Sequence, residues 1–229
     1  MVHTSLMRRL MREAGVKGGV ILFRGSGAAA RRYVEADRSR ADDYYLDADT
    51  SVAEFTALDR DGNVTAALGL APEAYAGWVD WVNPLTGESM GKPRLPGEGR
   101  QGSPRFAEMV VNAPKSLSIA AALHPEVSDA LDRAQQDAVA EIQHWLAQHS
   151  VTRVGPRGKQ EVVPVQQLQT VAVSHRTSRA GDPQLHTHVV ISNKAKTTLD
   201  GKWRSLDGRP MHAVVVALSE QIGRASCRE

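Results

Sequence analysis

Two apolar stretches in the second half of the 229-residue chain constrain its fold most strongly. Residues 167–175 and 185–193 are rich in β-branched side chains, so we expect two strands. Ala180-Gly181 lies between them and favours a turn, which predicts an antiparallel hairpin. With the turn centred there, His175 lies opposite His186.

Three imidazoles gather on one face of this predicted hairpin. His186 and His188 are two residues apart on one strand, so their side chains point to the same face. His175 lies beside His186 and diagonal to His188, because Val173 is predicted to lie opposite His188. Three neutral imidazoles can bind a divalent cation and leave coordination positions for substrate oxygens. The alternative is that these are ordinary surface or core histidines of a sheet.

Predicted strands and helices alternate along the remaining chain. We expect a buried strand at 18–23, and a helix at 112–123 that Asn112 caps and that has Pro114 in its first turn. This order, together with the hairpins, predicts an α+β fold with a central antiparallel β-sheet flanked by helices. The other predicted elements are a helix capped by Ser26, a helix at 71–82, a strand at 106–111, a helix at 127–148, a hairpin at 151–165 and a long loop at 83–105.

Composition excludes several other classes of protein. Hydrophobic residues make up 41% and charged residues 24%, which is ordinary for a globular domain. No apolar run is long enough for a membrane span, and the single cysteine, Cys227, rules out a disulfide framework. We therefore expect a protein of a reducing cytoplasm. The net charge of +2 is too small to indicate nucleic acid by itself.

Two chemistries are open to a three-histidine site. In one, the cation activates water, as in zinc hydrolases. In the other, it polarises a scissile phosphate and the protein supplies the nucleophile. Tyr33, Tyr44 and Tyr45 favour the second, because three of the four tyrosines lie within 13 residues in a polar segment. A tyrosine that attacks phosphate forms an ester that conserves the bond energy for rejoining.

Four motifs together resemble those of MobF-type conjugative relaxases, which are HUH endonucleases. Residues 174–188 resemble the three-histidine metal motif, and Asn-Ala-Pro-Lys-Ser at 112–116 resembles Ser-Ala-Pro-Lys-Ser. Residues 200–206 resemble Gly-Lys-Trp-Arg-Ala-Leu, and residues 42–45 resemble the second tyrosine pair of the family. The motifs occur in the family's order, over about residues 18–207.

The resemblance implies an activity and a set of roles. Such relaxases nick one strand at a plasmid transfer origin, remain on the 5′ end as a phosphotyrosine and later rejoin the strand. By this resemblance, Tyr33 is the first nucleophile, Tyr44 or Tyr45 is the second, and Glu108 orients a histidine or helps to deprotonate a tyrosine. His175, His186 and His188 would bind Mg²⁺, Mn²⁺ or Zn²⁺.

The chain departs from the family pattern at several positions. The acid is Glu108 where the family usually has Asp, and Val34 follows Tyr33 where it usually has a second tyrosine. We expect residues 1–17 to form a basic N-terminal extension and residues 18–229 a relaxase domain shortened at its C-terminal end. No Gly-x-x-x-x-Gly-Lys-Ser/Thr loop is present, so no helicase domain is expected.

The implied partners are single-stranded or hairpin DNA of a transfer origin, other relaxosome proteins and type IV secretion proteins. Basic residues in predicted loops would contact DNA phosphates and make binding salt-dependent. Two alternatives stay open: a truncated, non-catalytic DNA-binding module, and a three-histidine zinc hydrolase. The candidate DNA contacts are Lys92, Arg94, Arg100, Arg105, Arg153, Arg157, Lys159, Lys202 and Arg204.

Overall fold

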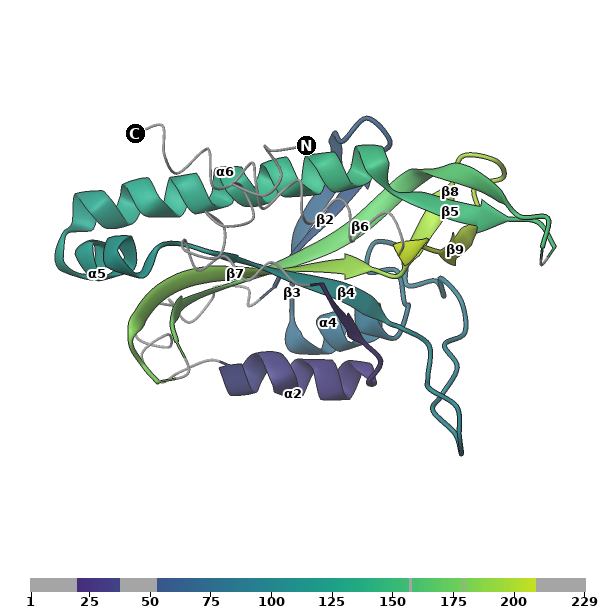
Figure 1. The fold of residues 1–229 in the computed structure, drawn as a ribbon, viewed down its shortest axis with the longest axis horizontal. Helices are drawn as coiled ribbons and strands as arrows, with labels where there is room; N and C mark the ends of the chain where they lie inside the picture. Colours follow the sequence, from purple (N-terminus) through teal and green to yellow (C-terminus); the bar gives the residue numbers. More distant parts are fainter. Residues whose placement is uncertain (1–19, 38–52, 157, 179, 209–229) are drawn as a thin grey trace, which may run out of the picture.

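The computed structural model describes residues 20–37, 53–156, 158–178 and 180–208 (Figure 1). Four helices lie within these residues: α2 (Gly27–Asp37), α4 (Pro72–Val79), α5 (Lys115–Leu123) and α6 (Pro125–His149). The strands are β1 (Ile21–Phe23), β2 (Ala53–Asp59), β3 (Val64–Leu70), β4 (Phe106–Asn112), β5 (Val151–Val154), β6 (Glu161–Thr177), β7 (Pro183–Ser192), β8 (Lys194–Thr197) and β9 (Trp203–Ser205).

The strands form one antiparallel sheet, in the order β1-β4-β7-β6-β2-β3. The 17-residue strand β6 is long enough to pair with β7 and β2 through its second half and with β5 and β8 through its first half. Helices α5 and α6 cover one face, and α2 and α4 lie on the other (Figure 1). The predicted α+β fold with a central antiparallel sheet flanked by helices is confirmed.

Each face of the sheet has its own apolar core. On one face, α6 buries Ile142 and Leu146 against strand residues such as Val189. These two helix residues are four positions apart and therefore lie on one side of the helix. On the other face, Trp78 of α4 packs with Phe55 and with neighbouring valines of β6 and β7. Because both faces of β6 and β7 are covered, their central residues are buried in continuous runs.

Two local predictions were wrong. The strand at 18–23 was expected to be buried, but among the described strands β1 pairs only with β4, at the sheet edge, and Ile21 and Leu22 are 58% and 44% exposed. Asn112 was expected to cap a helix, but it is the last residue of β4 and pairs with His186. Pro114 takes the capping position of α5, without a side-chain hydrogen bond.

The hairpin of β2 and β3 was not predicted. Asp59 organises its turn, because its carboxylate accepts the backbone N–H groups of Asp61 and Asn63 at 2.9 Å each. A hydrogen bond from the side-chain amide of Asn63 lowers the pKa of Asp59, and these backbone hydrogen bonds lower it further. The predicted extension 1–17 lies outside the described residues. Within the described part of the chain, no helix is both long and apolar enough to cross a membrane.

Candidate metal and nucleophile site

The predicted register of the histidine hairpin is confirmed. His175 of β6 pairs with His186 of β7, and Val173 pairs with His188. The connecting turn contains Gly181 at φ +81°, a left-handed conformation that glycine adopts without strain. His175 and His188 are buried and His186 is half-buried. The three rings therefore come together beneath the surface of the α2 side of the sheet.

The spacing of the three rings suits a shared cation. Their centroids are 5.2 Å apart for His175 and His186, 5.4 Å for His175 and His188, and 5.2 Å for His186 and His188. A metal ion about 2.1 Å from a ring nitrogen lies about 3.2 Å from that ring's centroid. Three such rings at tetrahedral angles have centroids about 5.2 Å apart, which agrees with the observed spacing.

The orientation of the rings is not that of a bound site. As the side chains are placed, no three His, Cys, Asp or Glu residues of the described part of the chain hold donor atoms around a common point. What agrees with a cation site is the type of donor and the separation of the ring centroids. The donor set and its spacing therefore fit a divalent cation.

Glu108 and a backbone carbonyl orient two of the imidazoles. Glu108 is buried on β4, and its carboxylate accepts a hydrogen bond from Nδ1 of His188. Nδ1 of His186 lies 3.1 Å from the carbonyl oxygen of Gln184 and donates to it. With Nδ1 engaged in both rings, Nε2 is the nitrogen that would bind a cation. This supports the predicted orienting role of Glu108.

Tyr33 lies beside the histidines although it comes from a different part of the chain. It is carried by α2 and is 37% exposed. Its ring centroid lies 6.5 Å from that of His188, with the ring planes nearly perpendicular. A half-exposed phenol at the rim of the histidine cluster can be reached by a substrate from solvent. Tyr44 and Tyr45 lie outside the described residues.

Tyr75 is a further tyrosine near this site, and the sequence reasoning gave it no role. It is buried on α4, where its ring centroid lies 6.1 Å from that of Trp78. Burial raises the pKa of Tyr75, and the nearby Glu108 and Tyr33 raise it further. Tyr75 is therefore held as the neutral phenol, whereas the half-exposed Tyr33 can reach substrate.

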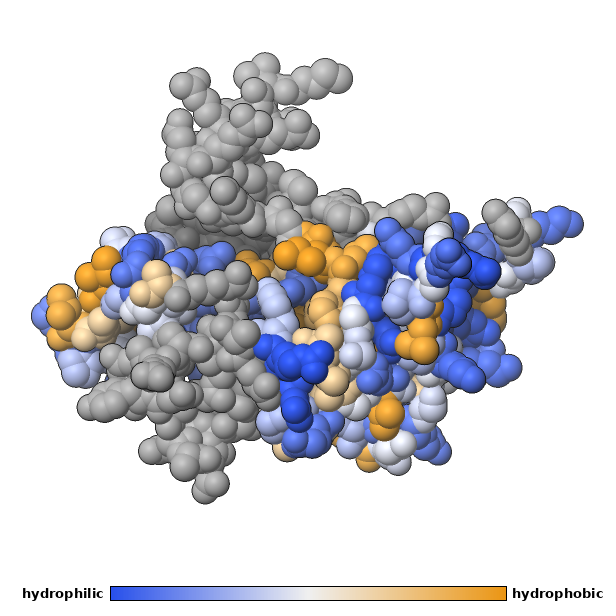
Figure 2. All heavy atoms as spheres, turned by 90° about the horizontal axis from the view of Figure 1, so that it is seen from below, coloured by the Kyte–Doolittle hydropathy of each residue, from blue (hydrophilic) through white to orange (hydrophobic). Residues whose placement is uncertain are grey.

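The basic residues predicted to contact DNA fall into separate groups. Lys92, Arg94 and Arg100 are exposed on the loop before β4, and Lys159 is exposed in the turn between β5 and β6. Lys202 is 75% exposed in the turn before β9. Arg157 lies outside the described residues. Figure 2 shows hydrophilic side chains gathered at the end of the molecule formed by β5, β8 and β9.

Three of the predicted arginines are engaged by carboxylates. Arg153 donates to Asp207 at 2.6 Å, and Arg204 binds Asp200 through two hydrogen bonds of 2.5 and 2.9 Å. Arg105 is 3% exposed and pairs with Asp80 at 2.9 Å. The prediction that Arg105 contacts DNA is therefore wrong, because its guanidinium is buried inside the protein.

Two lysines on β8 were missed by the sequence analysis. Lys194 Nζ lies 4.3 Å from the ring centroid of Trp81, and Lys196 Nζ lies 5.3 Å from that of Trp203. These distances are within the range of cation–π interactions. Burial lowers the pKa of Lys194. The sequence feature that could have indicated these lysines is their spacing of two residues, which places both on one face of a strand.

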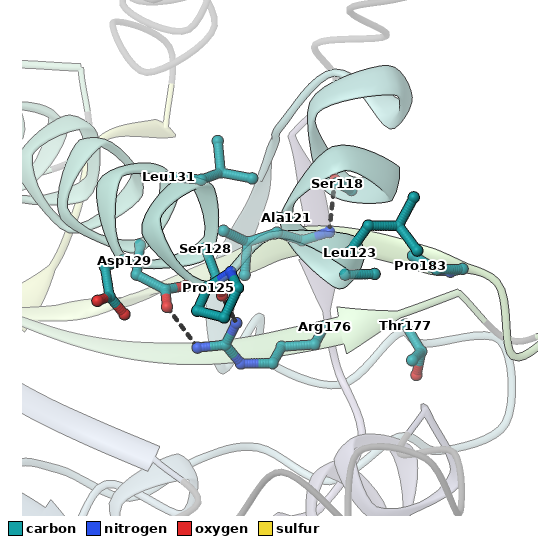
Figure 3. A pocket seen from close by; sticks show the side chains of 13 residues that line it. Ser118, Ala121, Leu123, Pro125, Ser128, Asp129, Leu131, Arg176, Thr177 and Pro183 are labelled. Atoms are coloured by element: carbon teal, nitrogen blue, oxygen red, sulfur yellow. Dashed lines mark hydrogen bonds and ion pairs between the residues drawn. The ribbon is translucent and has the colours of Figure 1, made fainter.

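A cavity lies on the other side of the sheet from the histidines. It has a volume of about 360 Å³ and is lined by residues of α5, α6, β6 and β7. Figure 3 shows Arg176 lining it and hydrogen-bonded to Ser128 of α6. Arg176 also forms an ion pair with Asp132 of α6. The cavity lies on the side of the sheet covered by α5 and α6, whereas α2 brings Tyr33 to the other side. It is therefore not where the phenol and imidazoles meet.

Comparison with known proteins identifies relatives of this site. Residues 27–226 match the family model described as TrwC relaxase. The multifunctional conjugation protein TraI of Escherichia coli is 37% identical over 101 residues, and TraI of Escherichia coli strain K12 is 35% identical over 101 residues. Each match covers 43% of this chain and about 5% of the relative's length.

Solved structures show the same fold. A metal-bound structure of conjugative relaxase TrwC in complex with OriT DNA gives a TM-score of 0.67 at 21% identity, and a copper-bound structure gives 0.69 at 23%. In each case the match covers 90% of this chain and 67% of the other. The family model covers most of the chain, so the chain belongs to the TrwC relaxase family.

Proposed function

We propose that this chain is a DNA relaxase domain that nicks one strand at a plasmid transfer origin and rejoins it. The observation that carries the proposal is the placement of the Tyr33 phenol 6.5 Å from the ring of His188, next to the three-histidine cluster. A family whose solved members include a relaxase bound to OriT DNA supports the same substrate. The mechanism proceeds through a 5′-phosphotyrosyl intermediate.

Tyr33 is the nucleophile in the proposed reaction. Its oxygen forms a bond to the scissile phosphorus while the bond from that phosphorus to the 3′ oxygen of the preceding nucleotide breaks. The phenol proton leaves to a base, and the departing 3′ oxygen takes up a proton as a hydroxyl. Rejoining reverses these bonds, because the phosphotyrosyl ester retains the energy of the broken phosphodiester.

The histidines and Glu108 prepare the position of the scissile phosphate. Glu108 holds His188 in one tautomer, and the Gln184 carbonyl holds His186 in the same way. When bound, a divalent cation supplies positive charge that stabilises the phosphate oxygens in the transition state. Three imidazoles suit Zn²⁺ better than Mg²⁺, which prefers oxygen ligands.

DNA contacts outside the reaction centre come from the exposed lysines and arginines. His175 is ten residues along β6 from Val165, which pairs with β8, so the β8 end lies about 33 Å from the histidines. That distance is about one turn of duplex DNA. We propose that Lys202 and Lys159 bind a DNA hairpin or flanking strand at the β8 end of the sheet. Tyr44 or Tyr45 supplies a second nucleophile in this proposal. Relaxosome proteins and type IV secretion proteins are the proposed partners, in the cytoplasm.

The test is covalent capture of DNA. The protein is incubated with Mn²⁺ and labelled single-stranded oligonucleotides that tile the DNA adjoining its coding sequence, and products are separated on a denaturing gel. We expect a protein-linked band that EDTA abolishes and that Tyr33→Phe abolishes or strongly weakens, while metal binding is retained. Tyr75→Phe is the matched control, because that phenol is buried. Undiminished adduct in a triple Phe variant at 33, 44 and 45 would refute the tyrosine chemistry.

A further inference from the structure

The N-terminus of α2, the helix that carries Tyr33, is held by a carboxylate from elsewhere in the chain. The backbone N–H of Gly27 donates to Oδ1 of Asp80 at 3.0 Å, across 53 residues of sequence. Asp80 follows α4 directly. A carboxylate at this position satisfies an amide that the helix leaves without an internal partner and interacts favourably with the positive end of the helix dipole. The predicted cap, Ser26 Oγ, accepts locally from the N–H of Ala29 at 3.3 Å, and Asp80 joins this end of α2 to the end of α4.

Arg105 in turn holds Asp80 against the sheet. Its Nη1 donates to the same Oδ1 atom at 2.9 Å, and its side chain is 3% exposed. The backbone of Arg105 is held at two points, because its N–H donates to Phe23 of β1 and its carbonyl accepts from Asn193, which joins β7 to β8. The carbonyl also accepts from Nε1 of Trp81 at 3.3 Å. The guanidinium is thus a fixed point next to the start of β4.

Glycine at position 27 allows α2 to approach α4 closely. A Cβ atom there would lie 1.9 Å from the carbonyl oxygen of Ala76. Backbone atoms cannot yield at that distance, so any other residue would push the two helices apart. A second link, the ion pair of Arg31 with Glu73 at 3.0 Å, is largely exposed to solvent and stabilises less.

The distance from this anchor to Tyr33 makes small movements matter. Tyr33 lies six residues after Gly27, which is about 9 Å along the helix axis. A tilt of about 6° at the anchored end therefore moves Tyr33 by about 1 Å, and a misplacement of that size can cost about 100-fold in rate. Within the part of the chain that the structure describes, α2 packs chiefly on α4 rather than on the sheet, so its placement depends mainly on how it is joined to α4.

We propose that the Asp80–Arg105 pair is a positioning device for the nucleophile helix. It sets the placement of Tyr33 relative to the histidines without touching the substrate. The proposal rests on the proposed function for its kinetic consequence, but the anchoring of α2 can be measured without any reaction. It also gives the buried Arg105 a role in place of the predicted contact with DNA.

The experiment compares Asp80→Ala and Asp80→Asn with Glu73→Ala as the matched control, since the control breaks the exposed link of the same helix to α4. Hydrogen exchange of the α2 amides is measured first, followed by the single-turnover rate of adduct formation at saturating oligonucleotide. Mn²⁺ affinity and oligonucleotide affinity are measured for each variant. Should Asp80→Ala fail to fold, Asp80→Ser serves in its place, because serine is too short to reach Arg105.

We expect Asp80→Ala to speed exchange in α2 and to slow adduct formation about 10-fold to 100-fold, with metal and DNA affinities unchanged. Asp80→Asn should recover most of the rate, because its Oδ1 still accepts from Gly27. Wild-type exchange of α2 in Asp80→Ala would overturn the inference whatever the activity. A wild-type protein that forms no adduct would overturn the proposed function instead, and the exchange measurement would still decide the anchor.

Discussion

Replacing Glu108 by Gln should weaken metal binding without disturbing the fold. The carboxylate accepts the Nδ1 proton of His188 and makes the opposite nitrogen a stronger ligand. Glutamine has the same shape and keeps an acceptor oxygen, so the loss is one of charge. Both partners are buried, so solvent screens their interaction little. Loss of such an outer partner typically costs about 10-fold to 100-fold in metal affinity, or about 1.4 to 2.8 kcal/mol.

The assay is titration calorimetry with Mn²⁺ and, separately, with Zn²⁺. Glu54→Gln is the matched control, because Glu54 is an exposed glutamate on β2 of the same sheet. We expect Glu108→Gln to lose affinity for both ions while Glu54→Gln does not. Equal affinities for Glu108→Gln and the wild type would refute the reasoning, since the carboxylate would then contribute nothing to ligand basicity. His188→Ala removes one imidazole, and its loss of metal affinity is the reference against which the loss in Glu108→Gln is compared.

The remaining predictions concern stability and DNA affinity. The hydrogen bonds from Arg204 hold the pKa of Asp200 well below its usual range, so their stabilisation is full above about pH 4 and is lost as the pH falls further. As the pH falls from about 4 to about 2, the midpoint temperature of unfolding should therefore fall less steeply in Asp200→Asn than in the wild type. Trp78→Phe should lower the free energy of unfolding, measured in urea, by about 2 kcal/mol or more. The buried Oε1 of Gln169 accepts a hydrogen bond from Nε1 of Trp78 at 3.1 Å, and phenylalanine removes that donor. An unchanged urea midpoint would contradict this prediction. Lys202→Gln should make the slope of log affinity for the oligonucleotide against log salt concentration shallower by about one. An unchanged slope would show that Lys202 does not contact the DNA.

The histidine hairpin could be predicted from sequence because every signal for it is local. Side chains alternate along both strands, and a glycine marks the turn, so the register follows by counting from the turn. The observed pairing of His175 with His186 agrees with that count. The contact of Glu108 with His188 required the additional information that β4 pairs with β7, which the order of residues alone does not give.

Other features depended on contacts between distant segments. The exposure of β1 follows from its place at the sheet edge, and an apolar run is the same in sequence whether it lies at the edge or the centre. Arg105 was read as a surface cation because it follows a basic loop, whereas Asp80 and Trp81 enclose it in the folded chain. Sequence supplies the charge of a side chain, but tertiary packing decides whether solvent reaches it.

The two halves of the candidate site are supported by different parts of the fold. The imidazoles lie on the two central strands and are oriented by Glu108 from the neighbouring strand β4, so their spacing is set by hydrogen-bonded pairs of the sheet. Tyr33 reaches them on a helix that packs chiefly on α4 and begins at the Asp80 anchor. Changes in the sheet should therefore alter metal affinity and cleavage together, whereas changes at the anchor should alter cleavage alone.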